Sequence, residues 1–307
     1  MSGLPLIIYV PGLLPKPDAE THKAALLRCL LAGIQRIDAD VAHDLKSNER
    51  CFELVAWTYD FYGEYRDFAL DAASVDALVA QAQVAQRDKD EASSWLRRAG
   101  RWLYTLGDLM PFLIPHIANE RMELHLRDLR RYGKNRNDIA EHSRQMLKMC
   151  LRAARESLRP ILLIAHSMGS VIAYEALWQM SRANREEMSI DLLLTMGSPL
   201  GQRFIQKRIK GCDAIGDVRF PDNIRRWINL ASVGDLTALD PVLQDDFEAM
   251  TRTGLTEPID DREVYNWFRF DGELNTHAEY GYLINPETAA IVVDWLRSVN
   301  SARDSAE

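Results

Sequence analysis

The chain has 307 residues, of which 47% are hydrophobic and 27% are charged, and its formal net charge at pH 7 is -8. This length and composition predict one large α/β domain with a full hydrophobic core and room for an insertion. A negative net charge offers no electrostatic attraction to nucleic acid, and nucleic-acid binding is therefore excluded from the expected functions.

The cysteines and the hydropathy pattern give no sign of an extracellular or membrane-spanning protein. The four cysteines are scattered: Cys29, Cys51, Cys150 and Cys212. None belongs to a Cys-x-x-Cys pair or has a nearby histidine at metal-ligand spacing, so we expect reduced, mostly packed thiols. No basic segment precedes an apolar run near Met1, and no run of about twenty uncharged apolar residues occurs. We expect a cytoplasmic location.

The first 63 residues predict a βαβ unit. Residues 4–10 are aliphatic and end at Pro11-Gly12-Leu13-Leu14-Pro15, which predicts a buried strand and a proline-bounded loop. Apolar residues recur at helical spacing over residues 21–37, and residues 52–58 predict a second strand. Strand, helix and strand in this order indicate a parallel sheet with helices on its faces.

Four aromatic residues follow the second predicted strand: Tyr59, Phe61, Tyr62 and Tyr65. They lie at the carboxyl end of that strand, which is the side where ligands bind in open α/β sheets. Two interpretations stay open at this point. Either the cluster lines a pocket, or it packs the loop.

Residues 64–134 contain no strand pattern and predict two or three helices. Within them, residues 95–113 carry apolar side chains at helical spacing, from Trp95 to Leu113. Such an amphipathic insertion could act as a lid over an active site, pack on the core as any helix does, or contact a membrane surface or a protein partner. We expect a helical insertion here, with the lid as the leading hypothesis.

The most informative stretch is residues 161–170. Aliphatic residues predict a buried strand, and a helical pattern follows at residues 171–180, with Ser167 at the turn between them. Ala165 and Gly169, two positions before and after the serine, are small enough for the crowded backbone of a nucleophile elbow. In that motif a strained turn exposes the serine hydroxyl. The alternative is a serine that only caps the helix.

Two further aliphatic strands are predicted after the elbow helix, at residues 190–196 and 224–231. The first ends in Gly197-Ser198-Pro199-Leu200-Gly201, which suits a backbone that passes close to a site, although any tight turn could have this sequence. Asp235 follows the second strand. The acid of a catalytic triad lies on such a loop, which favours Asp235 and leaves Asp240, in the same turn, as the alternative.

The candidate base is His277, the only histidine after Ser167. It follows a β-rich run at residues 264–270, which we expect to be the last strand. Serine, aspartate and histidine then occur in the order in which a nucleophile elbow is followed by its acid and its base. Helices predicted at residues 137–158 and 286–299 complete the alternation of helices and strands.

Two backbone N–H groups are candidates for an oxyanion hole. In acyl transfer, one such donor commonly comes from the loop after an early strand and the other from the residue after the nucleophile. These positions are Leu13, where Gly12 permits an unusual backbone, and Met168. The alternative for the loop is an ordinary strand-to-helix turn.

Together these motifs resemble the α/β-hydrolase superfamily, in particular its lipase and esterase branch. The resemblance rests on Pro11-Gly12-Leu13, Gly197-Ser198-Pro199-Leu200-Gly201, Gly234-Asp235-Leu236, His277 and the elbow Ala165-His166-Ser167-Met168-Gly169. The elbow is similar to the alanine-bearing variant found in some bacterial lipases. The resemblance implies an α/β fold with a mostly parallel sheet flanked by helices, a triad of Ser167, His277 and Asp235, and neither a metal nor an organic cofactor.

The resemblance extends from residue 4 to about residue 299 and is interrupted by the helical region. It divides the chain into an α/β-hydrolase core at residues 1–63 and 135–300, a helical insertion at residues 64–134 and a polar tail at residues 301–307. The short segment before the first strand predicts a sheet that lacks the first strands of a full eight-stranded sheet.

The sequence therefore predicts a serine hydrolase that cleaves a small-molecule ester or a lipid-like ester through an acyl-enzyme intermediate. A thioesterase, an amidase or an acyltransferase would use the same residues. An alternative of a different class is a non-catalytic module that has the hydrolase fold and binds a partner. Peripheral contact with a membrane or a protein partner through the helical insertion is a further expectation.

Overall fold

The central feature of the fold is a parallel β-sheet. The computed structural model describes residues 3–95, 97, 99 and 120–304. Within these residues six strands form one sheet in the order β2-β1-β3-β4-β5-β6, and every neighbouring pair is parallel. The strands are β1 (Leu6–Val10), β2 (Phe52–Leu54), β3 (Ile161–His166), β4 (Ile190–Met196), β5 (Ile224–Ser232) and β6 (Asp260–Val264). Two short strands, β7 (Arg269–Phe270) and β8 (Glu273–Leu274), form a separate antiparallel pair.

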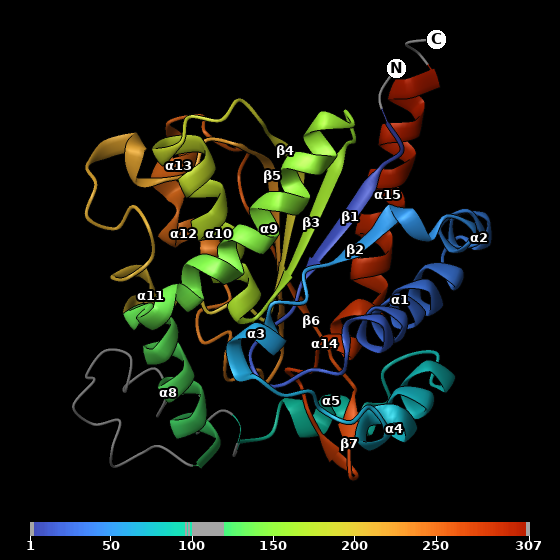
Figure 1. Ribbon diagram of the computed structural model, residues 1–307. Helices are drawn as coiled ribbons and strands as arrows, with labels where there is room; N and C mark the ends of the chain where they lie inside the picture. Colours follow the sequence, from blue (N-terminus) through green and yellow to red (C-terminus); the bar gives the residue numbers. More distant parts are fainter. Residues whose placement is uncertain (1–2, 96, 98, 100–119, 305–307) are drawn as a thin grey trace.

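Long helices cover both faces of this sheet (Figure 1). They are α1 (Ala19–Gln35), α9 (Ile139–Glu156), α10 (Met168–Trp178) and α15 (Pro286–Asp304). Side chains alternate along each strand, so Ile7 packs in a buried cluster with α1 and α15, whereas Ile8 packs in a second cluster with α9 and α10. The predicted α/β fold, a mostly parallel sheet flanked by helices, is confirmed.

Shorter helices connect these elements. They are α2 (Ala39–Ser47), α3 (Thr58–Tyr62), α4 (Ala69–Ala80), α5 (Gln86–Ala92), α8 (Glu120–Lys134), α11 (Arg203–Gln206), α12 (Leu243–Asp246), α13 (Glu248–Arg252) and α14 (Glu279–Leu283). Three of them, α4, α5 and α8, lie in the region 64–134, for which the sequence predicts helices. Most of the apolar stripe at residues 95–113 lies outside the described residues, so the lid stays a prediction. Of the helices that are described, none combines the length and the apolar character needed to cross a membrane.

Two strand predictions are partly wrong. The last strand of the sheet is β6, which ends where the predicted strand 264–270 begins. Trp267 and Phe268 are buried but belong to no strand. They pack against the core from a loop. The sequence does not predict β6, because it is an edge strand made largely of charged residues. The strand expected at residues 52–58 ends at Leu54, and its last residue already belongs to α3.

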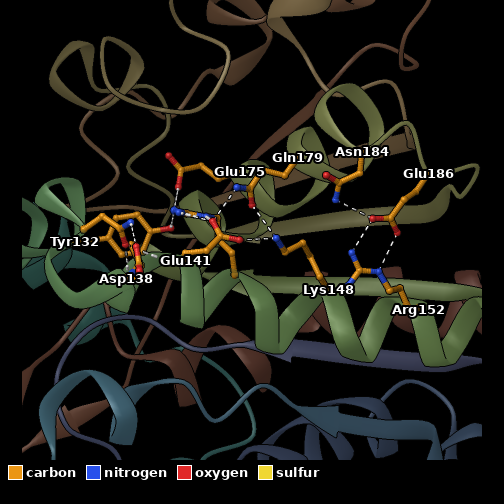
Figure 2. Close-up of polar contacts among 12 residues, drawn as sticks. Tyr132, Asp138, Glu141, Lys148, Arg152, Glu175, Gln179, Asn184 and Glu186 are labelled. Atoms are coloured by element: carbon orange, nitrogen blue, oxygen red, sulfur yellow. Dashed lines mark hydrogen bonds and ion pairs between the residues drawn. The ribbon is translucent and has the colours of Figure 1, made fainter.

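A buried ionic network joins α8 and α9 to α10, the helix that begins directly after Ser167. Arg144 Nη1 lies 2.6 Å from Glu175 Oε2, and the Tyr132 hydroxyl donates to the same oxygen at 2.8 Å (Figure 2). Lys148 Nζ lies 2.7 Å from Glu141, which also accepts from Arg144. The Arg144–Glu175 pair is deeply buried. Removal of one partner from such a pair is strongly destabilising, so the network favours one arrangement of the three helices.

Candidate active site

Ser167 occupies a strained turn between β3 and α10. Its backbone has φ 54° and ψ -125°, which residues other than glycine rarely adopt. The Ser167 N–H donates to the Met196 carbonyl oxygen at 2.9 Å, and a Cβ at Gly169 would collide with the carbonyl oxygen of Val10. Glycine is therefore required where α10 approaches the end of β1. This is the geometry expected of a nucleophile elbow.

Three side chains from separate loops meet at this turn. The Ser167 hydroxyl lies 2.9 Å from His277 Nε2, and His277 Nδ1 lies 2.8 Å from Asp235 Oδ2. Because an ionised carboxylate can only accept, Nδ1 carries the proton, and Nε2 accepts from the serine. Asp235 follows β5, and His277 follows the β7–β8 pair. The structure brings together the serine, the acid and the histidine that were selected from the sequence.

Asp235 is buried and has three hydrogen-bond donors. Besides His277, the Tyr282 hydroxyl donates to Oδ2 at 2.7 Å, and the Thr237 N–H donates to Oδ1 at 2.8 Å. Burial raises the pKa of this carboxyl, but the His277 imidazole and these hydrogen bonds outweigh burial, so the pKa lies below its ordinary value. Asp240, the alternative acid, is exposed, and one of its oxygens accepts a backbone N–H of its own turn at 3.2 Å.

His166, the residue before the serine, supports the candidate base. Its Nε2 donates to the His277 carbonyl oxygen at 2.9 Å, and the two rings lie 4.7 Å apart. Burial, together with the neighbouring His277, lowers the pKa of His166 to about 3, so its ring is neutral near pH 7. The hydrogen bond from His166 holds the backbone of His277, whose ring faces Ser167.

The turn after β4 passes directly against the acid and the histidine. Gly197 has φ 56°, and a Cβ on it would lie 2.9 Å from Asp235 Oδ2 and 3.0 Å from His277 Nδ1. A side chain at this position would therefore press on both partners of that hydrogen bond. Of the two interpretations of the 197–201 turn, the structure favours a backbone that passes close to the site.

The loop after β1 lies against Ser167. A Cβ on Gly12 would come within 2.8 Å of Ser167 Cβ and 3.3 Å of its Oγ. The N–H groups of Leu13 and Met168 donate to no acceptor in the part of the chain that the structure describes. Both groups are thus available to a ligand, and their assignment as oxyanion donors stays a prediction.

Comparison with known protein families bears on the fold. A family described as an alpha/beta hydrolase of unknown function (DUF900) matches residues 119–203, a segment that contains β3, Ser167 and α10. Together with the parallel sheet and its flanking helices, this match gives the chain an α/β-hydrolase fold. No curated protein and no solved structure matches the chain.

The described part of the predicted insertion is joined to the core of the fold. Arg97 Nη2 donates to the Leu274 carbonyl oxygen at 2.7 Å, and Nη1 donates to Thr276 Oγ1 at 3.2 Å. Nη1 also lies 3.4 Å from the carbonyl oxygen of Gly234. Leu274 ends β8, and Thr276 and Gly234 lie on the loops of the histidine and the acid, so Arg97 connects both loops to residues that follow α5.

Sequence reasoning missed the residues that support this site. Tyr282 lies in α14, five residues beyond His277, where the sequence does not distinguish a tyrosine that donates to Asp235 from one that only packs in the core. Arg97 is remote in sequence from the loops that it contacts, and no periodic pattern marks it. In the residues open to description, no group of three or more His, Cys, Asp or Glu side chains is arranged to hold a metal ion.

Proposed function

We propose that this α/β hydrolase cleaves carboxylic esters by nucleophilic catalysis, with a small-molecule or lipid-like ester as substrate. The observation that carries the proposal is the continuous line of hydrogen bonds from Ser167 through His277 to Asp235. A serine hydroxyl is a weak nucleophile by itself, and an adjacent imidazole that is oriented by a carboxylate activates it. The positive φ of Ser167 supports the same proposal, because strain of this kind persists where function requires it.

In the acylation step, His277 Nε2 removes the hydroxyl proton of Ser167 while Oγ attacks the ester carbonyl carbon. The carbonyl oxygen takes the negative charge, and the N–H groups of Leu13 and Met168 stabilise it. The bond between this carbon and the alcohol oxygen then breaks, and the imidazolium gives its proton to the leaving alcohol. The acyl group stays on Ser167 as an ester.

Deacylation repeats these steps with water as the nucleophile. His277 takes a proton from water as the water oxygen attacks the acyl carbon, and it returns this proton to Oγ of Ser167 when the acyl ester breaks. The product is a carboxylic acid. Asp235 stays ionised at neutral pH because its pKa lies below the ordinary value, and its negative charge stabilises the imidazolium.

Labelling with a fluorophosphonate tests whether the protein is an enzyme, because this reagent bonds covalently to an activated serine. Wild type should be labelled and Ser167→Ala should not. Ser47→Ala, which changes an exposed serine at the end of α2, is the matched control and should be labelled as wild type is. Equal labelling of wild type and Ser167→Ala would leave the non-catalytic binding module as the better assignment.

A substrate panel distinguishes ester hydrolysis from the other activities that the same residues would support. The panel consists of p-nitrophenyl esters, acyl thioesters and anilides, with a second alcohol present as a competing acyl acceptor. We expect the highest kcat/KM for the esters and transfer of the acyl group to water. A higher kcat/KM for a thioester or an anilide, or transfer mainly to the alcohol, would replace ester hydrolysis by thioesterase, amidase or acyltransferase activity.

A further inference from the structure

The loop that carries the Leu13 N–H group is held on both sides by side chains that follow β2. On the amino-terminal side, Trp57 Nε1 donates to the Pro11 carbonyl oxygen at 2.9 Å. Trp57 is completely buried, and its ring packs edge-on against Phe61 at a centroid distance of 5.4 Å. The Pro11 carbonyl is therefore fixed to the core, next to the point where Gly169 approaches it.

On the carboxyl-terminal side, the Tyr62 hydroxyl accepts from the Leu14 N–H at 3.0 Å. The same hydroxyl donates to Asp128 Oδ2 at 2.9 Å. Asp128 lies on α8 and is only 2% exposed. Burial raises the pKa of Tyr62 well above its ordinary value, so the phenol keeps its proton and donates it to Asp128. Its lone pairs then remain available for the Leu14 N–H.

The backbone of Leu14 shows why such support is needed. Leu14 has φ 77°, in the left-handed region that costs a residue with a side chain free energy. Strained conformations of this kind persist only where surrounding contacts hold them. The Tyr62 hydroxyl accepts from the Leu14 N–H, so this contact supports the strained conformation.

We propose that Trp57 and Tyr62 are positioning residues that hold Gly12 and Leu13 between them, with the Leu13 N–H directed at the oxyanion. Only these two loop residues separate the two anchored ones, Pro11 and Leu14. A fixed donor stabilises the oxyanion without reorganising when the charge develops, and a displaced donor loses most of that effect. The inference rests on the proposed function and adds to it the residues that shape the oxyanion hole.

Tyr62→Phe tests the inference, because it removes one hydroxyl and leaves the ring. Tyr59→Phe is the matched control, since it makes the same change on an exposed tyrosine of the same helix, α3. Rates of p-nitrophenyl ester hydrolysis are divided by the concentration of sites titrated with a fluorophosphonate, so that unfolded chains do not count. For Tyr62→Phe we expect kcat to fall about 10- to 100-fold and KM to stay within about twofold of wild type. Tyr59→Phe should match wild type.

An alkyl boronic acid supplies a readout that a purely structural role would not change. It adds to the serine and forms a tetrahedral anion, so its inhibition constant should rise in Tyr62→Phe by the same factor by which kcat/KM falls. An unchanged boronic acid affinity, or kinetics equal to those of Tyr59→Phe, would overturn the positioning role. So would a loss confined to KM.

Two further variants keep the outcome decisive. Tyr62→Phe removes the donor to Oδ2 of the buried Asp128 carboxylate and leaves only Arg127 Nε, 3.3 Å from Oδ1, which could unfold the protein. Tyr62→Phe combined with Asp128→Asn removes that charge and should show the same loss of kcat and of boronic acid affinity. Ser167→Ala is assayed in parallel. If it hydrolyses esters as fast as wild type, the proposed function fails and the positioning role fails with it. If only Ser167→Ala loses activity, the positioning role alone is wrong.

Discussion

Substitution of Gly197 by alanine is a sharp test of the site geometry, because this residue touches the acid and the histidine without taking part in the chemistry. Gly197 has φ 56°, so any side chain there is strained. A Cβ would also lie 2.9 Å from Asp235 Oδ2 and 3.1 Å from His277 Cε1. The substitution thus combines backbone strain with a clash at the hydrogen bond between those two residues.

The size of the effect follows from these distances. Ordinary van der Waals contacts of a Cβ begin at 3.4 Å, so the carboxylate or the imidazole of His277 must move by about 0.5 Å. The His277–Asp235 hydrogen bond is only 2.8 Å long and would bend or lengthen. Misplacement on the order of 1 Å costs about a hundredfold in rate, so we expect kcat of Gly197→Ala to fall about 10- to 100-fold. Strain at positive φ should lower the free energy of unfolding by about 1–3 kcal/mol.

Gly254→Ala separates the strain from the clash. Gly254 has φ 74°, but nothing lies within 4 Å of a Cβ built on it. Both variants should lose stability in urea denaturation, and only Gly197→Ala should lose ester hydrolysis per titrated site. Wild-type activity in Gly197→Ala, or an equal loss of activity in both variants, would refute the reasoning that catalysis requires an undistorted Asp235–His277 hydrogen bond.

Three further predictions concern the acid and a buried ion pair. Asp235→Asn should lower kcat for ester hydrolysis by roughly 10³- to 10⁴-fold while Asp240→Asn matches wild type; loss only in the second variant would reverse the assignment. Glu279, which is 5% exposed, accepts from Lys16 at 2.7 Å and contacts His22 at 3.1 Å. Glu279→Gln should therefore lower the free energy of unfolding at pH 7 by about 3 kcal/mol in urea denaturation; an unchanged midpoint would contradict this. Burial raises the pKa of Glu279, but Lys16 and His22 outweigh it and hold the pKa well below its ordinary value. The ionised carboxylate therefore stabilises the fold above the ordinary carboxyl range and loses this effect as the pH falls below it, so the acid-induced loss of stability should be shallower in Glu279→Gln than in wild type.

The buried strands and the order of the candidate residues could be predicted from the sequence. β3 and β4 are buried on both faces apart from Asp191 of β4, so their aliphatic runs are easily recognised. Ser167, Asp235 and His277 lie on loops after strands, and the order in which such loops follow one another is visible in a linear chain. This is why these three residues can be selected together from the sequence alone.

Elements whose identity depends on their neighbours could not be predicted. β6 carries charged residues and becomes a strand only because β5 offers it a partner at the edge of the sheet. The sequence favours Asp235 over Asp240, but both lie in one turn, and the contact with His277 that distinguishes them is visible only in the structure. Tyr62 is an extreme case, since its role arises from one hydroxyl that meets a loop 48 residues away.

Peptide mapping of the fluorophosphonate adduct by mass spectrometry tests the central claim most directly. We predict one adduct per chain, located on Ser167, and a greatly reduced labelling rate in His277→Ala, because the serine then lacks its base. An adduct on another serine, or labelling of His277→Ala at the wild-type rate, would contradict the claim that His277 activates Ser167 for attack.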